Sequence, residues 1–179
     1  MTYKLSSPYI GAQPLNVTST TQNHALGTIV RGVDDGATPS TSSQSQGGTS
    51  QGEGEFIYLL GVASTAVGSV VTYDPSTYQT TLCAVGGNIP RPIAIAMSAN
   101  VASQYGWYQI GGVATVKKTC TISLAAGAAV GVLTTGLIAG TGSGKEIDGA
   151  AVAAVASAAA SRTTVRVMLQ RPTKQGRVT

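Results

Sequence analysis

Residues 105–116 decide the fold, and they read YGWYQIGGVATV. Aromatic and β-branched residues, which favour extended chain, fill both halves of this stretch. Gly111-Gly112 separates the halves, and glycine can take positive φ at both positions of a tight turn without steric cost. The pattern therefore predicts two strands, 105–110 and 113–116, that pair with each other as a β-hairpin.

Short apolar runs separated by turn residues continue along most of the chain. Runs of this kind, bounded by Gly, Pro, Asn or Asp, are typical of strands. Residues 147–156 are ambiguous, because alanine favours a helix while the flanking sequence is strand-like, and we favour a strand. Pro172 is expected to end the last strand. The other predicted strands are 26–33, 56–62, 68–73, 78–85, 93–97, 119–124, 128–133 and 163–169.

This organisation predicts an all-β fold, a small antiparallel β-barrel or sandwich with an extended, irregular N-terminal arm. Helical bundles and Rossmann folds are disfavoured because no long amphipathic pattern is present. Two regions are expected: residues 1–55 as arm and linker, and residues 56–179 as the β-rich body. Within the first, residues 37–55 (ATPSTSSQSQGGTSQGEGE) bury too little apolar area to order alone.

The N-terminal arm carries isolated apolar residues in a polar segment. Such an arm can lie along a neighbouring subunit and become ordered there, although a merely frayed tail is the alternative. The candidate anchors are Tyr3, Leu5, Tyr9 and Ile10.

Charge is scarce and unevenly placed. Charged residues make up 10% of the chain, so a subunit that covers much of its surface with partners is favoured over a free-standing protein. The net charge is +4, and after the last acid, Asp148, the chain carries only basic groups. This end could meet an acidic protein surface or remain solvated. Nucleic acid is a weaker expectation, because aromatics do not interleave with the basic groups. These groups are Arg162, Arg166, Arg171, Lys174 and Arg177.

Catalytic motifs are incomplete. Residues 140–145 (GTGSGK) resemble a phosphate loop, but that motif needs glycine at position 139 and Ser or Thr at 146, where this chain has Ala139 and Glu146. His24 is the single histidine and lies in the polar N-terminal region, with no GxSxG elbow elsewhere in the chain. The sequence therefore predicts a protein that is not an enzyme and binds no cofactor.

Metal and membrane sites are not expected either. Cys83 and Cys120 form no CxxC pair and no Cys/His cluster, so buried free thiols are favoured over zinc ligands, and a disulfide stays open. The N-terminus lacks the apolar core of a signal peptide. The alanine-rich residues 150–160 are too few to cross a bilayer.

One aromatic cluster stands out, formed by Tyr105, Trp107 and Tyr108. Packing in the core or at a barrel rim is the simpler interpretation. The functional alternative is an interface anchor, because Trp and Tyr dominate such contacts.

Five sequence blocks follow one another in an order that resembles the head decoration, or cement, proteins of tailed bacteriophages. The resemblance covers about residues 26–172 and rests on serial order, since no single motif is diagnostic. It implies a small β-rich domain that binds the outside of an icosahedral capsid, often as a trimer, with no catalytic residues. The blocks are 54–62 (GEFIYLLGV), 68–74 (GSVVTYD), 93–97 (IAIAM), 104–112 (QYGWYQIGG) and 165–169 (VRVML).

The resemblance implies the major capsid protein and further copies of this chain as partners. It also implies a location on the outer surface of the virion, after synthesis in the host cytoplasm. A tail or baseplate component, or a surface adhesin that binds carbohydrate through exposed tyrosines, is the alternative. Our candidate partner-binding residues are Tyr3, Leu5, Tyr9, Ile10, Trp107, Tyr108, Arg166, Arg171, Lys174 and Arg177.

Overall fold

All regular structure in the described part of the chain is β, which confirms the predicted fold class. The computed structural model describes residues 3–5, 12–34, 51–85, 89–119, 121–142, 145–159 and 163–175. It contains no membrane-spanning helix within those ranges. The strands are β1 (Tyr3–Leu5), β2 (Ile29–Asp34), β3 (Glu53–Leu60), β4 (Val70–Tyr73), β5 (Thr80–Leu82), β6 (Ile93–Ala96), β7 (Tyr105–Lys117), β8 (Ala129–Thr134), β9 (Leu137–Gly140), β10 (Glu146–Val152) and β11 (Thr164–Lys174).

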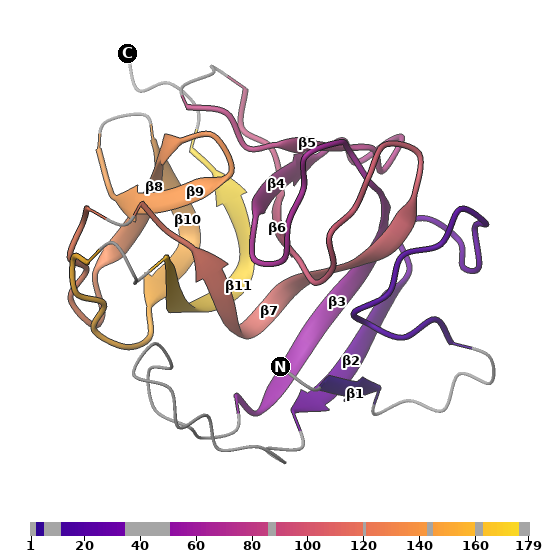
Figure 1. Ribbon diagram of the computed structural model, residues 1–179, viewed down its shortest axis with the longest axis horizontal. Helices are drawn as coiled ribbons and strands as arrows, with labels where there is room; N and C mark the ends of the chain where they lie inside the picture. The colour runs from indigo at the N-terminus through magenta and orange to yellow at the C-terminus, as the bar shows by residue number, and fades with distance from the viewer. Residues whose placement is uncertain are drawn as a thin grey trace.

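The strands form one antiparallel sheet that curls into a half-barrel (Figure 1). Along the main path their order is β1-β2-β3-β7-β11-β10-β8-β9. A branch leaves this path where β6 pairs with β7, and β4 then lies between β6 and β5. β7 is therefore the strand at which the main path and the branch meet.

The predicted hairpin at Gly111-Gly112 is wrong, because β7 runs through both glycines without turning back. Gly112 has the positive φ that a turn would need, at 81°. It uses that conformation inside the strand, next to a β-bulge where Glu55 faces Gly111 and Phe56 faces Gln109. A bulge bends a strand and increases its twist. The first half of β7 consequently pairs with β3, and the second half pairs with β11.

A second bulge explains why Pro172 does not end β11. The pairing of β10 with β11 shifts between Asp148 and Ala150, and Gly149 there has a φ of 75°. Proline is tolerated at such irregularities because no regular hydrogen bond from its nitrogen is required. β11 therefore extends beyond the proline to Lys174.

Two other predicted elements change. Residues 119–124 form no strand in their described part and contribute a single bridge, from Leu124 to Ala156. The ambiguous segment is a strand over Glu146–Val152 only. The sequence analysis also missed β9, which forms a hairpin with β8 around Gly136 at a φ of 73°.

The predicted boundary between arm and body falls inside β3, and part of the predicted arm belongs to the sheet. β2 pairs with β3 over five residue pairs, and Leu15 and Val30 are buried. Residues 12–34 are therefore part of the folded body. The central part of the predicted linker, residues 35–50, lies outside the described residues, as do Tyr9 and Ile10.

The core is divided because β3 is buried on both faces. Phe56 and Tyr58 pack with Leu15, Val30, Met97 and Trp107 in an aromatic cluster. Ile57 and Leu59 face the other way and pack against residues of β4, β6 and β7. The largest cluster fills the space that separates β4 and β6, on one side, from β7 to β11, on the other. Its members are Val70, Cys83, Ile93, Ile95, Ala114, Val116, Leu124, Val130, Val132, Ile138, Ile147, Val152, Ala156, Val165, Val167 and Leu169.

We predict that Gly112→Ala lowers the free energy of unfolding by about 3 kcal/mol or more. A Cβ at this position overlaps the carbonyl oxygen of Glu53, and this overlap adds to the cost of positive φ. Gly127→Ala is the matched control, because Gly127 has a φ of 76° with open space around its Cβ position. It should cost only about 1 kcal/mol. Equal losses for both variants in denaturant titrations would contradict the close approach of β3 and β7.

Candidate functional site

Trp107 and Tyr108 are not surface anchors, which corrects their assignment as partner-binding residues. Both side chains are 0% exposed. The Trp107 indole Nε1 donates to the Gln13 carbonyl oxygen at 2.9 Å, and Asn100 Nδ2 bonds to the Tyr108 hydroxyl. The reason is the central position of β7, whose two faces are covered by different parts of the chain. The simpler interpretation, core packing, is confirmed.

The basic C-terminal end is not a uniform solvated patch. Lys174 is 6% exposed, and its Nζ donates to the Ala84 carbonyl oxygen at 2.8 Å. This contact corrects its assignment as a partner-binding residue. Arg166 is half-buried on β11, while Arg171 is exposed and ion-paired. Arg162 and Arg177 lie outside the described residues.

The N-terminal candidates are only partly placed. The backbone of Tyr3 and Leu5 belongs to β1, which pairs with β2 through the pairs Tyr3–Asp34, Lys4–Val33 and Leu5–Gly32. Their side chains are not described. The structure therefore brings the start of the chain to an edge of the sheet, beside a site that the sequence analysis did not find.

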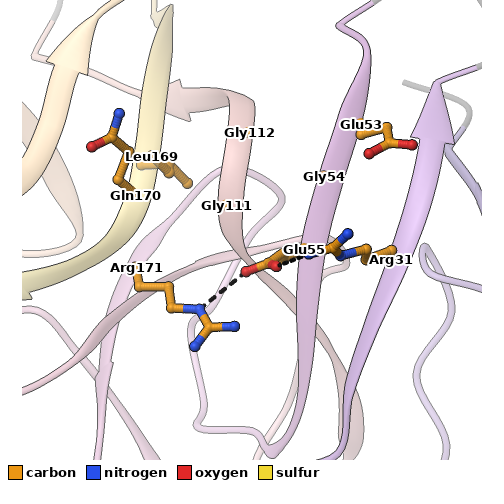
Figure 2. Close-up of a pocket in the computed structure, with 9 residues that line it drawn as sticks. All are labelled: Arg31, Glu53, Gly54, Glu55, Gly111, Gly112, Leu169, Gln170 and Arg171. Atoms are coloured by element: carbon orange, nitrogen blue, oxygen red, sulfur yellow. Dashed lines mark hydrogen bonds and ion pairs between the residues drawn. The ribbon is translucent and has the colours of Figure 1, made fainter.

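That site is a pocket of about 270 Å³ where β2, β3, β7 and β11 come together (Figure 2). Charged side chains and bare backbone make up most of its lining. Its residues are Arg31, Glu53, Gly54, Glu55, Gly111, Gly112, Leu169, Gln170 and Arg171.

Three of the residues that line the pocket are glycines, and they lie where β3 and β7 approach each other closely. A Cβ at Gly111 would lie 3.1 Å from the Glu55 Cβ. At Gly54 a Cβ would lie 3.0 Å from the Phe56 ring and 3.1 Å from Gln109 Nε2. The close approach of β3 and β7 thus requires small residues at these positions.

Glu55 lies at the centre of the pocket, between two arginines that approach it from opposite sides (Figure 2). Arg171 Nε donates to Oε2 at 3.1 Å, and Arg31 Nη2 donates to Oε1 at 3.3 Å. The hydrogen bond from Arg171 is the main cause that lowers the pKa of Glu55; Arg31 adds to it and partial burial opposes it. One carboxylate therefore links β2, β3 and β11.

Backbone conformation aims Arg171 at this carboxylate. Its backbone φ is 46°, a value that residues other than glycine rarely adopt. Arg171 lies in the bulge opposite Gly149. Such strain persists only where the surrounding structure enforces it. Arg171 and Glu55 are 116 positions apart in the chain, so no local sequence signal could have paired them. The strand pattern of residues 53–60 could have assigned Glu55 to a sheet rather than to a linker.

His24 packs against the aromatic cluster and accepts a backbone hydrogen bond. Its Nε2 accepts the backbone N–H of Gln13 at 3.1 Å, and its ring lies 5.0 Å from the Tyr58 ring and 5.2 Å from Trp107. The half-buried ring thus belongs to the covering of the aromatic cluster.

Cys83 is a buried free thiol, as expected. Burial raises its pKa to about 11, although Lys174 opposes the shift. A thiol with so high a pKa is a poor nucleophile at neutral pH. Cys120 lies outside the described residues. No group of three or more His, Cys, Asp or Glu side chains in the described ranges is placed to hold a metal ion.

The pocket is lined by two arginines and two glutamates, Arg31, Arg171, Glu53 and Glu55, which suits the recognition of polar or charged groups. Comparison with protein-family models gave no match, and comparison with curated proteins gave no relative.

We predict that Glu55→Gln lowers the free energy of unfolding by at most about 1 kcal/mol at pH 7, because both arginines are largely exposed. The folded-state pKa of Glu55 lies below its ordinary value of 4.5. Its ion pairs therefore contribute fully above that pH and are lost as the pH falls through the folded-state value. The difference between wild type and variant should shrink below pH 4.5 and in high salt. A difference that grows on acidification would contradict the ion pairs.

Proposed function

We propose that the chain decorates the outer surface of a bacteriophage head and strengthens contacts between capsomers of the major capsid protein. One observation carries the proposal: the five sequence blocks behind the resemblance contribute to β3, β4, β6, β7 and β11. These strands are contiguous in one sheet, since β4 pairs with β6, β6 with β7, and β7 with both β3 and β11. The blocks therefore form the framework of the fold.

The position of β1 supports a role for the N-terminal arm. β1 is the first strand of the sheet order, and three residue pairs join it to β2. Sheet edges are natural sites for pairing with another chain, and main-chain hydrogen bonds provide the affinity. A short segment at this edge can be exchanged for a segment of a neighbour at little cost.

The outward face of β2, next to β1, also has the composition of a contact surface. Ile29 and Val33 are large apolar residues that stay exposed, and Arg31 lies between them. Arginine is enriched in the cores of protein interfaces, where apolar contact surrounds it. Arg31 also lines the pocket, so apolar and charged contacts continue from β2 toward Arg171.

The proposed action is mechanical. A head filled with DNA is under pressure, and its weakest places are the seams between capsomers. A protein placed over such a seam adds buried area, about 800 Å² on each side for a typical stable contact. A homotrimer multiplies these contacts, and binding at several sites strengthens attachment beyond any single interface. The low charge content, at 10%, is consistent with extensive coverage by partners.

The alternative, a carbohydrate-binding adhesin or tail component, depended on exposed tyrosines. Tyr58 and Tyr108 are buried, and Tyr73, Tyr78 and Tyr105 are half-buried. None of these tyrosines is fully exposed, so they do not favour this alternative.

Binding to expanded heads that lack the decorating protein tests the proposal. We predict that the full chain binds them, raises the temperature at which they release DNA, and gives density over the capsomer seams by cryo-electron microscopy. A variant without residues 1–11 should bind at least tenfold more weakly, because main-chain pairing at the edge is lost. Removing residues 1–55 would be uninformative, since it also deletes β2 and Leu15.

The matched control keeps the chain length and replaces residues 1–11 with glycine and serine. It should also bind weakly, because glycine is depleted in strands and the replacement removes the side chains of Tyr3 and Leu5. Circular dichroism and sedimentation of both variants, compared with the full chain, check that the body stays folded. Failure of the full chain to bind any head, together with binding to glycan arrays, would overturn the proposal.

A further inference from the structure

Residues 12–28 lie across the aromatic cluster, and Gln13 fastens them there. The Gln13 side chain is 5% exposed, and all four of its hydrogen-bonding positions are used. Its Oε1 accepts from the Tyr58 hydroxyl at 2.8 Å and from Asn23 Nδ2 at 3.0 Å. Its Nε2 donates to the carbonyl oxygens of Val17 at 2.6 Å and Tyr105 at 3.2 Å.

The backbone of Gln13 completes this attachment. Its carbonyl oxygen accepts from the Trp107 indole, and its N–H donates to His24 Nε2 at 3.1 Å. The second bond requires a lone pair on Nε2, so His24 is neutral in this arrangement and carries its proton on Nδ1. A protonated imidazole has donors at both nitrogens and cannot accept this bond.

The His24 ring packs against aromatic side chains. Its ring contacts are Tyr58 of β3 and Trp107 of β7, and Tyr105 of β7 stacks on Tyr58. Tyr58 stays neutral near pH 7, because burial raises its pKa above 10.0. Within the described part of the chain, His24 contacts the Gln13 backbone and two aromatic rings, and neither a carboxylate nor a cation. Attraction between a charged ring and these aromatics can retain the ring, but it cannot restore an acceptor for Gln13.

We infer that His24 is a proton-operated latch on residues 12–28. Neutral His24 holds Gln13 over the aromatic cluster. Protonation of Nε2 places an N–H donor of the ring against the N–H donor of Gln13, and this releases the backbone of Gln13. The segment then opens more often around Trp107. This device is independent of the proposed capsid function, since it concerns contacts within one chain.

Hydrogen exchange of the full chain at pH 7.5 and pH 5.5, corrected for the intrinsic effect of pH, tests the latch. We expect exchange within residues 12–28 to rise about fivefold at the lower pH, the effect of losing one ordinary hydrogen bond. Exchange in β8 to β11 should stay constant. Glu55 and Asp74 remain charged across this range, because their pKa values are lowered by their hydrogen bonds. Fluorescence of Trp107, the single tryptophan, should change over the same interval.

Two substitutions separate the latch from other effects of acid. His24→Gln supplies an acceptor that does not titrate, so exchange should be slow and equal at both pH values. His24→Phe keeps an aromatic ring without an acceptor, so exchange should be fast at both. A constant rate in the wild type, or the same acid-induced rise in His24→Gln, would overturn the inference. If a variant folds poorly, an NMR pH titration of the wild type provides the test. The latch is excluded if the signals of the Gln13 amide and the Trp107 indole N–H do not shift together with those of the His24 ring protons.

Discussion

The close approach of β3 and β7 at Gly112 is the constraint on which the rest of the structure depends. The backbone of β7 passes so near the Glu53 carbonyl that no side chain fits between them. This contact places the bend of β7 where its pairing changes from β3 to β11. One strand can then belong to both halves of the half-barrel, so the core forms around a single continuous sheet (Figure 1).

The same irregularities that bend the sheet build the pocket. Gly111 and Gly112 come from the bulge in β7, and Arg171 comes from the bulge between β10 and β11. In a regular strand the side chain of Arg171 would follow the alternation of β11 between the two faces of the sheet. Its positive φ instead turns the side chain toward Glu55. The charge pattern on this surface is thus a product of backbone geometry. It differs from a chance grouping of exposed charges, because Glu55 is held by two strands that are distant in sequence.

Local sequence was sufficient for the fold class and for most strands, but not for how they join. The strands at 70–73 and 93–96 fall within predicted ranges, and the strand at 129–134 ends one residue beyond the predicted range of 128–133, since apolar runs between turn residues mark them directly. The Gly111-Gly112 pair misled because glycine serves a hairpin turn and a bulge through the same positive φ. Trp107 and Tyr108 suggested a surface anchor because Trp and Tyr dominate interface contacts. Nothing near Gln13 in sequence indicates its bonds to Tyr58 of β3 and Trp107 of β7. The pocket escaped prediction for the same reason, as its ion pairs join residues far apart in the chain.

The N-terminal region combines two kinds of attachment that differ in strength. β1 is joined to the sheet by three residue pairs at an edge, whereas residues 12–28 are anchored by buried Leu15 and by the hydrogen bonds of Gln13. Burial of a leucine side chain alone contributes about 2 kcal/mol. A neighbour that captured β1 would therefore meet resistance at Gln13 before it disturbed β2 or the aromatic cluster. In the proposed role this arrangement lets the end of the chain engage another subunit while the body keeps its core. The attachment at Gln13 is then the natural place for control, because protonation of His24 would weaken the anchor while the pairing of the strands stays intact.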